Sequence, residues 1–440
     1  MAPEEACYDG ALMAGRVLLL LWASALFAFA QDSSRVCAGC HKEVWESYRR
    51  TGMGRSFSLP SADNTPVSAS PYFHAASESY FTMSVRGESY FQRRHQLDAS
   101  RREINVMEKR VDYVMGSGNL ARTYLHRTAA DTLIELPLGW YAEKGGYWAM
   151  NPGYDRPDHE GFRRPITYDC MFCHNAYPKI EARKPWAEAV YAGAIPLGID
   201  CERCHGSGAR HMDLAGRPGV ARELVRRAIV NPARLTAERQ MEICMACHLE
   251  TTSFPLPNAI QRYERGPFSF RPGEALADFI LNFDHAPGAG REEKFEIVSA
   301  AYRLRRSACF VKSAGKMLCT TCHNPHEAPR GAAAAVQYNG VCRQCHGGGL
   351  SASSHTGQSD CVSCHMPKRR TEDVIHAAVT DHYIQRHKPA GDLMAARAER
   401  QDSYRGEVAL YYPPTLAPTP EADLYRAVAQ VKQNSNLKAG

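Results

Sequence analysis

Two stretches of alternating apolar and polar residues lie in the first third of the chain, and both predict β-hairpins. Residues 80–96 alternate with a period of two on either side of Gly87, a residue suited to a tight turn. Residues 131–150 show the same alternation around Gly145 and Gly146. Both stretches are rich in Tyr, Phe, Trp and Val, which favour strands. The pattern predicts a small antiparallel β insert near residues 70–150.

Elsewhere the apolar pattern is helical and short. Helices are expected at 42–51 and 236–249, and another at 420–432, where Thr419 would cap the helix and Pro420 would take its first position. A proline-rich stretch before this last helix predicts a stiff linker, and nothing obvious in the sequence would pack on the helix. The expected fold class is therefore mainly α and irregular, with the β insert as the exception.

An apolar run near the N-terminus predicts export. Arg16 precedes residues 17–30, which are mostly apolar and end in Ala-Phe-Ala, a small-x-small cleavage pattern. The run is shorter than the roughly 20 residues of a membrane span, although an uncleaved anchor is the alternative. We expect a signal peptide, a periplasmic or otherwise exported protein, and no stable membrane span in the mature chain.

Cysteine usage carries the strongest chemical signal, because Cys-x-x-Cys-His occurs seven times. With 16 Cys and 18 His among 440 residues, chance predicts only about 0.02 copies. Two thiols one helical turn apart can each add to a vinyl group of one porphyrin, and the next residue then presents its imidazole to the iron. The residues predicted to bind seven covalently attached haem c groups are Cys37, Cys40, His41, Cys170, Cys173, His174, Cys201, Cys204, His205, Cys244, Cys247, His248, Cys319, Cys322, His323, Cys342, Cys345, His346, Cys361, Cys364 and His365.

Two other cysteine chemistries fit this pattern less well. Structural zinc needs two Cys pairs per site, so seven pairs would leave one pair over, and zinc does not require a His after every second Cys. A disulfide framework has no use for seven identical His placements. Cys309 lies outside every motif, and both a buried apolar thiol and a reactive or iron-ligating thiolate stay open for it.

The uneven spacing of the motifs divides the chain. A long gap follows the first motif, whereas six motifs follow one another between Cys170 and His365. In this six-haem part the haems should form much of the core, with short helices carrying the motifs. The expected divisions are a signal peptide at 1–30, a first haem segment at 31–69, the β-containing insert at 70–160, a six-haem cytochrome c domain at 161–390, and a proline-rich linker with a terminal helix at 391–440.

Eleven His residues lie outside the motifs, enough for every iron to receive a second imidazole. His211 and His326 follow motif His residues so closely that each would have to serve a neighbouring haem. At the first haem, Met53 or His126 would bind. The full set of predicted further iron ligands is His126, His211, His285, His326, His355, His376, His382 and Met53. The acids Asp284 and Asp381 would orient neighbouring ligand imidazoles.

The net charge of +6 would by itself favour an anionic partner. Seven haems would each add two propionates, which offset this charge, so no nucleic-acid binding is expected. The expected partners are redox proteins, with a small-molecule substrate as a further candidate. The sequence does not indicate an oligomeric state.

Several segments resemble multihaem cytochromes c related to hydroxylamine oxidoreductase and to its tetrahaem electron acceptor. They are Cys-Ala-Gly-Cys-His-Lys-Glu-Val-Trp-Glu-Ser-Tyr from Cys37, Cys-Glu-Arg-Cys-His-Gly-Ser-Gly-Ala-Arg-His from Cys201, and Cys-Val-Ser-Cys-His-Met-Pro from Cys361. The resemblance covers about residues 35–390 and implies that His211 is an axial ligand. It departs at Met53, where relatives commonly carry His. The tail from Leu424 resembles the start of helical tetratricopeptide repeats, which would make this chain the haem part of a longer protein.

The resemblance implies electron transfer rather than catalysis. No motif ends in Lys, as the catalytic motif of the related pentahaem nitrite reductases does, and the eighth motif of octahaem oxidoreductases is absent. We expect a periplasmic heptahaem c-type cytochrome that transfers electrons between redox partners through closely packed haems. Two alternatives stay open: a reductase or oxidoreductase that acts on a small nitrogen or sulfur compound at one open haem, and a haem-bearing interaction module of a repeat scaffold.

Overall fold

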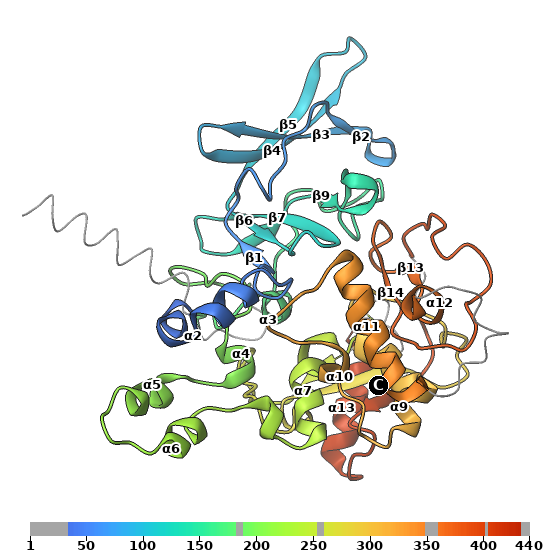
Figure 1. Cartoon of the computed structure of the whole chain (residues 1–440). Helices are drawn as coiled ribbons and strands as arrows, with labels where there is room; N and C mark the ends of the chain where they lie inside the picture. The colour runs from blue at the N-terminus through green and yellow to red at the C-terminus, as the bar shows by residue number, and fades with distance from the viewer. Residues whose placement is uncertain (1–33, 182–187, 253–258, 348–359, 401–403, 433–440) are drawn as a thin grey trace, which may run out of the picture.

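The computed structural model describes residues 34–181, 188–252, 259–347, 360–400 and 404–432. The predicted signal peptide and His355 lie outside these residues. Within them, twelve α-helices accompany several small antiparallel sheets, so the fold is mixed α and β and the expectation of a mainly α chain is wrong. Figure 1 shows the strands of residues 57–150 in the upper part of the molecule and most helices below them. No helix in the described part of the chain is both long and apolar enough to cross a bilayer.

The β region, residues 57–150, contains two antiparallel sheets. Its strands are β1 (Phe57–Ser58), β2 (Tyr72–His74), β3 (Ser79–Arg86), β4 (Ser89–Leu97), β5 (Glu103–Val111), β6 (Tyr113–Met115), β7 (Ala121–Arg127), β8 (Leu133–Glu135), β9 (Leu138–Tyr141) and β10 (Tyr147–Met150). One sheet has the order β2-β3-β4-β5, and the other has the order β1-β6-β7-β9-β10 with β8 paired to β7. The predicted β insert is confirmed, and it is larger than expected.

The two predicted hairpins differ in outcome. The hairpin at 80–96 is confirmed as β3 and β4, and Gly87 in their turn has φ +58°, which glycine adopts without steric cost. The hairpin at 131–150 is confirmed only in its second half, where β9 pairs with β10. Its first half, β8, pairs with β7 instead. Buried Val114, Tyr124 and Leu136 give the β region an apolar cluster of its own.

Each Cys-x-x-Cys-His motif lies on a short helix or at its end. These motif helices are α2 (Arg35–Tyr48), α3 (Tyr168–His174), α4 (Glu202–His205), α7 (Ala237–His248), α10 (Cys319–Cys322), α11 (Gly331–His346) and α12 (Cys361–His365). The helix predicted at 236–249 is confirmed as α7, where Arg239 N donates to Thr236 Oγ1 at 3.3 Å. The helix predicted at 42–51 begins earlier, and α2 includes the first motif with a kink at His41.

The remaining elements connect and cover the motif helices. They are the helices α5 (Ala209–Ala215), α6 (Arg222–Arg227), α8 (Ala300–Arg306), α9 (Ala308–Lys312) and α13 (Pro420–Val431), and the strands β11 (Ala259–Gln261), β12 (Ile280–His285), β13 (Lys368–Arg370), β14 (Ala378–Thr380) and β15 (Val408–Tyr412). β11, β12 and β15 form one sheet, and β13 pairs with β14. These two sheets were not expected from the sequence.

The C-terminal segment packs on the rest of the chain. The helix predicted at 420–432 is confirmed as α13, and Ala422 N donates to the Thr419 hydroxyl at 3.2 Å. Its Tyr425 and Ala429 are buried against Leu281 and Phe283 of β12. The expectation that this helix has nothing to pack on is therefore wrong, and part of the expected linker is β15, which pairs with β12.

The largest apolar cluster lies where the β region meets the motif helices. It includes Phe57 and Leu125 from strands, Phe172 from α3 and Met245 from α7, and the thiols of several motifs pack against it. Side chains alone therefore supply a substantial core. A core formed largely by haem stays a prediction.

Candidate haem-binding site

Within the described residues, three pairs of imidazole rings join a motif His to a His from another segment. The pairs, with the distance between ring centres and the angle between ring planes, are His41 and His211 (6.3 Å, 21°), His205 and His326 (5.9 Å, 12°), and His323 and His382 (6.2 Å, 37°). A fourth close pair, His74 and His159 (5.6 Å, 59°), contains no motif His. An iron held by two imidazoles through bonds of about 2 Å would place the ring centres about 6 Å apart. The spacing of the three pairs that contain a motif His suits an iron between the rings.

Backbone carbonyls set the orientation of several of these rings. The Nδ1 atoms donate as follows: His205 to Val230 O at 2.9 Å, His211 to Val225 O at 2.9 Å, His365 to Gln385 O at 2.6 Å and His382 to Thr380 O at 3.1 Å. A carbonyl oxygen accepts only from a protonated Nδ1, so the neutral ring keeps the lone pair of Nε2 for a metal. This is the tautomer that an iron ligand needs.

One connecting segment orients rings that belong to two different pairs. α5 carries His211, and the chain returns through α6 to residue 230. The carbonyls of Val225 and Val230 then hold His211 and His205, respectively. The segment between the third and fourth motifs therefore positions the third motif's imidazole and also the imidazole that faces the first motif.

Thiols of different motifs lie in contact. In the described residues, three pairs of thiols are joined by a hydrogen bond that raises the pKa of the first thiol and lowers that of the second: Cys201 and Cys37, Cys173 and Cys247, and Cys244 and Cys319. Burial and then the Cys361 thiol raise the pKa of Cys342 to about 11, and Cys322 contributes to the same rise. Burial and then Cys247 raise the pKa of Cys204 to about 11. The thiol pairs thus join motif one to three, two to four, four to five and six to seven, and electrostatic interactions link motif three to four and five to six.

The protonation of the motif imidazoles also suits metal binding. Burial is the main cause that lowers the pKa of His174, His248 and His323, so these rings are neutral near pH 7. Iron binds the neutral form through a ring nitrogen. Paired thiols, neutral imidazoles and facing second imidazoles together form a donor set that fits haem c.

Three other predicted ligands have different surroundings. His126 donates through Nδ1 to Asp112 Oδ2 at 2.9 Å in the β region. His285 packs edge-on against Tyr404 at 4.3 Å between ring centres, and both of its ring nitrogens are buried without a hydrogen-bond partner in the described residues. His376 packs 5.1 Å from Tyr141 with Nε2 3.7 Å from Asp155. None of these rings faces a motif imidazole among the described residues, and His355 lies outside them.

The main chain of Met53 lies close to the main chain of the second motif. The Ser56 hydroxyl is 2.8 Å from both Met53 O and His174 O, so these two main chains are far closer than those of residues that bind opposite faces of one iron. At the first motif, His211 faces His41. The structure thus places the imidazole of His211 opposite the first motif.

The motif imidazoles of His174, His248 and His346 face no other imidazole among the described residues. His174 is half-buried and His248 is exposed, and the second and fourth motifs lie against each other because the Cys173 and Cys247 thiols are hydrogen-bonded. The second and fourth motifs therefore differ from the first, third and fifth, which each have an opposing His.

The expected role of Asp381 beside a ligand imidazole is wrong. Its carboxylate binds Arg303 through two hydrogen bonds of 2.9 and 2.7 Å, and Arg369 at 2.9 Å. The His382 ring instead donates to the backbone of Thr380. Asp381 therefore fixes the chain next to His382 rather than the ring itself. The sequence contained no signal for this network, because Arg303 lies in a distant helix.

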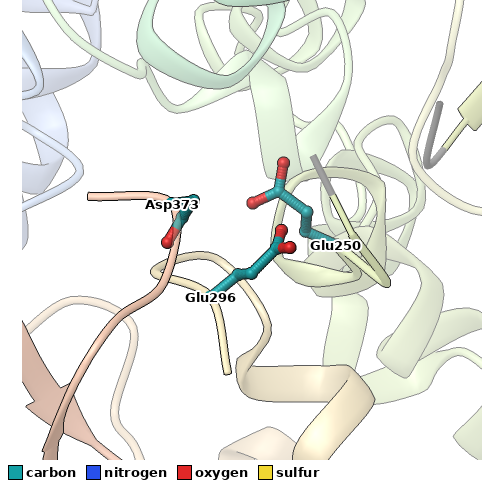
Figure 2. Close-up of side chains that lie close together, drawn as sticks. All are labelled: Glu250, Glu296 and Asp373. Atoms are coloured by element: carbon teal, nitrogen blue, oxygen red, sulfur yellow. The ribbon is translucent and has the colours of Figure 1, made fainter. Parts of the chain in front are cut away.

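Three carboxylates gather just after the fourth motif. Figure 2 shows Glu250, Glu296 and Asp373 close together, and oxygen atoms of all three lie within 4.8 Å of one another. Burial raises the pKa of Asp373 to about 6. Burial, followed by the charges of Asp373 and Glu296, also raises the pKa of Glu250. Burial and mutual repulsion thus favour protonated forms in this cluster, which the sequence analysis missed.

Comparison with known protein families supports haem attachment. A family described as a doubled CXXCH motif matches residues 311–349, which contain the fifth and sixth motifs. The chain therefore carries a paired motif of the multihaem cytochrome c type, which implies covalently bound haem c and indicates electron transfer. Neither the curated proteins nor the solved structures gave a match.

Proposed function

We propose that this protein is an exported, periplasmic cytochrome c that carries seven covalently attached haems and passes electrons between redox partner proteins. The facing imidazole pairs carry the proposal, because each joins a motif His to a His from another segment at the spacing of two ligands on one iron. Haem iron supplies reversible one-electron chemistry when bound. The side chains of this protein attach the haems, orient both axial imidazoles and keep successive motifs in contact.

The thiol contacts support a continuous route along the motifs. Thiols join motif one to three, four to five and six to seven, and the thiols of motifs three and four and of motifs five and six interact electrostatically. We propose that electrons enter near one end of this series and leave near the other. Motif two, beside motif four, would form a branch. The segments resembling relatives of hydroxylamine oxidoreductase support the same kind of function.

Haem count and iron ligation test the proposal directly. Mass spectrometry of the purified protein should find seven haem additions, and peptide mapping should place one on each Cys pair. Electron paramagnetic resonance of the oxidised protein should show low-spin irons for the motifs that have a facing His. Fewer haems, or high-spin iron at the first, third or fifth motif, would contradict the proposal.

A reductase of a small nitrogen or sulfur oxyanion is the second candidate. The observation that favours it is the lack, among the described residues, of an imidazole facing His174, His248 or His346. An iron with one free position could bind such a substrate. A high-spin signal that changes on adding nitrite, together with turnover of nitrite or hydroxylamine, would favour this candidate over the electron carrier. An all low-spin spectrum without turnover would exclude it.

Export has its own test. The apolar run at 17–30 and the small-x-small pattern at its end support cleavage before Gln31. N-terminal sequencing of protein recovered from the periplasm should therefore begin at Gln31. A mature protein that retains residues 17–30 and sediments with membranes would favour the uncleaved anchor.

A further inference from the structure

A buried arginine lies where three motifs meet. Arg203 stands between the two Cys of the third motif and is only 8% exposed. Its Nη2 donates to the carbonyl of Phe172 in the second motif at 2.7 Å. Its guanidinium carbon lies 4.3 Å from the centre of the Phe172 ring and 5.0 Å from that of Tyr177. The aromatic rings hold the guanidinium in place between the motifs.

The charge of Arg203 reaches the thiols of the second, third and fourth motifs. After the Cys173 thiol, Arg203 is the next group that lowers the pKa of Cys247, to about 7. It also opposes the rise in the pKa of Cys173 and of Cys204. A cation that acts on three thiols also acts on a haem bound through them, with a strength that depends on its distance from the iron.

Buried Asp200 accepts from the Arg203 backbone N–H at 3.2 Å and acts on the pKa of Cys204 in the opposite direction to Arg203, but among the described residues it forms no ion pair with the guanidinium. The Arg203 Nη1 is buried without a hydrogen-bond partner in the same residues, and no carboxylate there pairs with the guanidinium. The Cys247 sulfur cannot serve as an anion once it has formed a thioether. Arginine stays protonated even when buried, and burying an unpaired cation is costly. The guanidinium therefore keeps its positive charge. Asp200 opposes this charge at Cys204 and Glu250 opposes it at Cys173, whereas no carboxylate in the described part of the chain opposes it at Cys247.

We propose that Arg203 raises the reduction potentials of the haems attached to the second, third and fourth motifs relative to the other haems. Reduction adds an electron to the iron, so a nearby positive charge stabilises the reduced state, and it does so strongly where water is excluded. This inference rests on the proposed function, because it requires haem at these motifs. It assigns the highest potentials to the middle of the series of motifs.

Replacing Arg203 with a neutral residue tests the effect of its charge on the haem potentials, and Arg343 supplies a matched control. Arg203→Gln should lower between one and three steps of a redox titration. Arg203→Lys, which keeps the charge, should stay close to wild type. Arg343 also stands between the two Cys of a motif, the sixth, in the sequence, but its side chain is exposed. Arg343→Gln should therefore leave every step of the redox titration unchanged, because water screens its charge.

The possible outcomes separate this inference from a purely structural role. Arg203→Gln with full haem content and wild-type potentials would overturn it, as would an equal shift in the Lys variant. If Arg203→Gln does not accumulate with full haem content, Tyr177→Glu would carry the test by adding a carboxylate beside the arginine, with Tyr177→Gln as its control. Equal potentials in these two variants would also overturn the inference. A wild-type protein without haem at motifs two to four would instead refute the proposed function.

Discussion

The β region and the motif region are built in different ways. Between residues 57 and 150, paired strands supply their own backbone hydrogen bonds and enclose their own apolar cluster. Between residues 161 and 390, the described helices range from the four residues of α4 to the sixteen of α11. Helices shorter than about 12–15 residues are marginal by themselves. The comparison teaches that the β region has the means to fold alone, whereas the motif region depends on long-range contacts and, in our proposal, on haem.

Blocking haem attachment should produce the largest difference between the two regions. Expression without a cytochrome c maturation system should leave the motif region open to protease, because metal binding and folding are coupled. The β region should survive as a resistant fragment close to residues 57–150. Limited proteolysis followed by mass spectrometry measures both outcomes. A haem-free chain as resistant as the holoprotein along its whole length would refute the dependence on haem.

Removing one facing imidazole should open one iron in the motif region. His211→Ala should produce a high-spin signal in electron paramagnetic resonance, because the iron bound by His41 would lose its opposing ligand. His126→Ala is the matched control from the β region, where the ring contacts Asp112, and it should add no high-spin signal. A fully low-spin His211→Ala protein would show that the two rings do not share an iron.

Creating a cavity in the β region should lower its stability without changing the environment of the haems. Leu136 is fully buried, so Leu136→Ala should reduce the free energy of unfolding by about 2–5 kcal/mol. Val106 is 52% exposed on β5, and Val106→Ala should change stability little. Denaturation followed by far-ultraviolet circular dichroism measures the loss, and the haem absorption spectrum should not change. A changed haem spectrum would show that the two regions are coupled.

The carboxylate cluster should make the motif region sensitive to pH. Because the pKa of Asp373 is raised to about 6, the folded state binds this proton more tightly than the unfolded state does. The free energy of unfolding should therefore fall as pH rises from about 4 to 6, by at most about 3 kcal/mol. Asp373→Asn should remove this fall, so the variant should gain stability relative to wild type as pH rises from about 4 to 6. Parallel pH profiles of the two proteins would disprove this.

The smallest effect is expected at Met53. Since His211 already faces His41, Met53→His should leave the redox titration as it is in the wild type. If Met53 were an iron ligand, one step should fall by about 0.1 V or more, within the roughly 0.8 V range that axial ligands control. Such a fall would extend the list of ligands beyond the facing imidazole pairs.

Local patterns in the sequence determined the features that depend on neighbouring residues. The alternation around Gly87 predicted β3 and β4, and Thr236 and Thr419 marked the starts of α7 and α13. The Cys-x-x-Cys-His motifs identified haem c chemistry for the same reason: thiol spacing and the adjacent imidazole lie within five consecutive residues. Each of these signals is complete within one turn or one short element.

Only the tertiary structure decided which distant residues meet. The sequence limited His211 and His326 to neighbouring haems, but the pairings with His41 and His205 depend on how separate helices pack. The same reason explains why the partner of α13 was missed, since β12 lies far earlier in the chain. The burial of Arg203 among three motifs was equally invisible, because residues between two Cys of such a motif can be buried, as Arg203 is, or exposed, as Arg343 is. Periodicity and spacing describe one segment at a time, whereas ligand pairing, burial and electrostatics arise from contacts between segments.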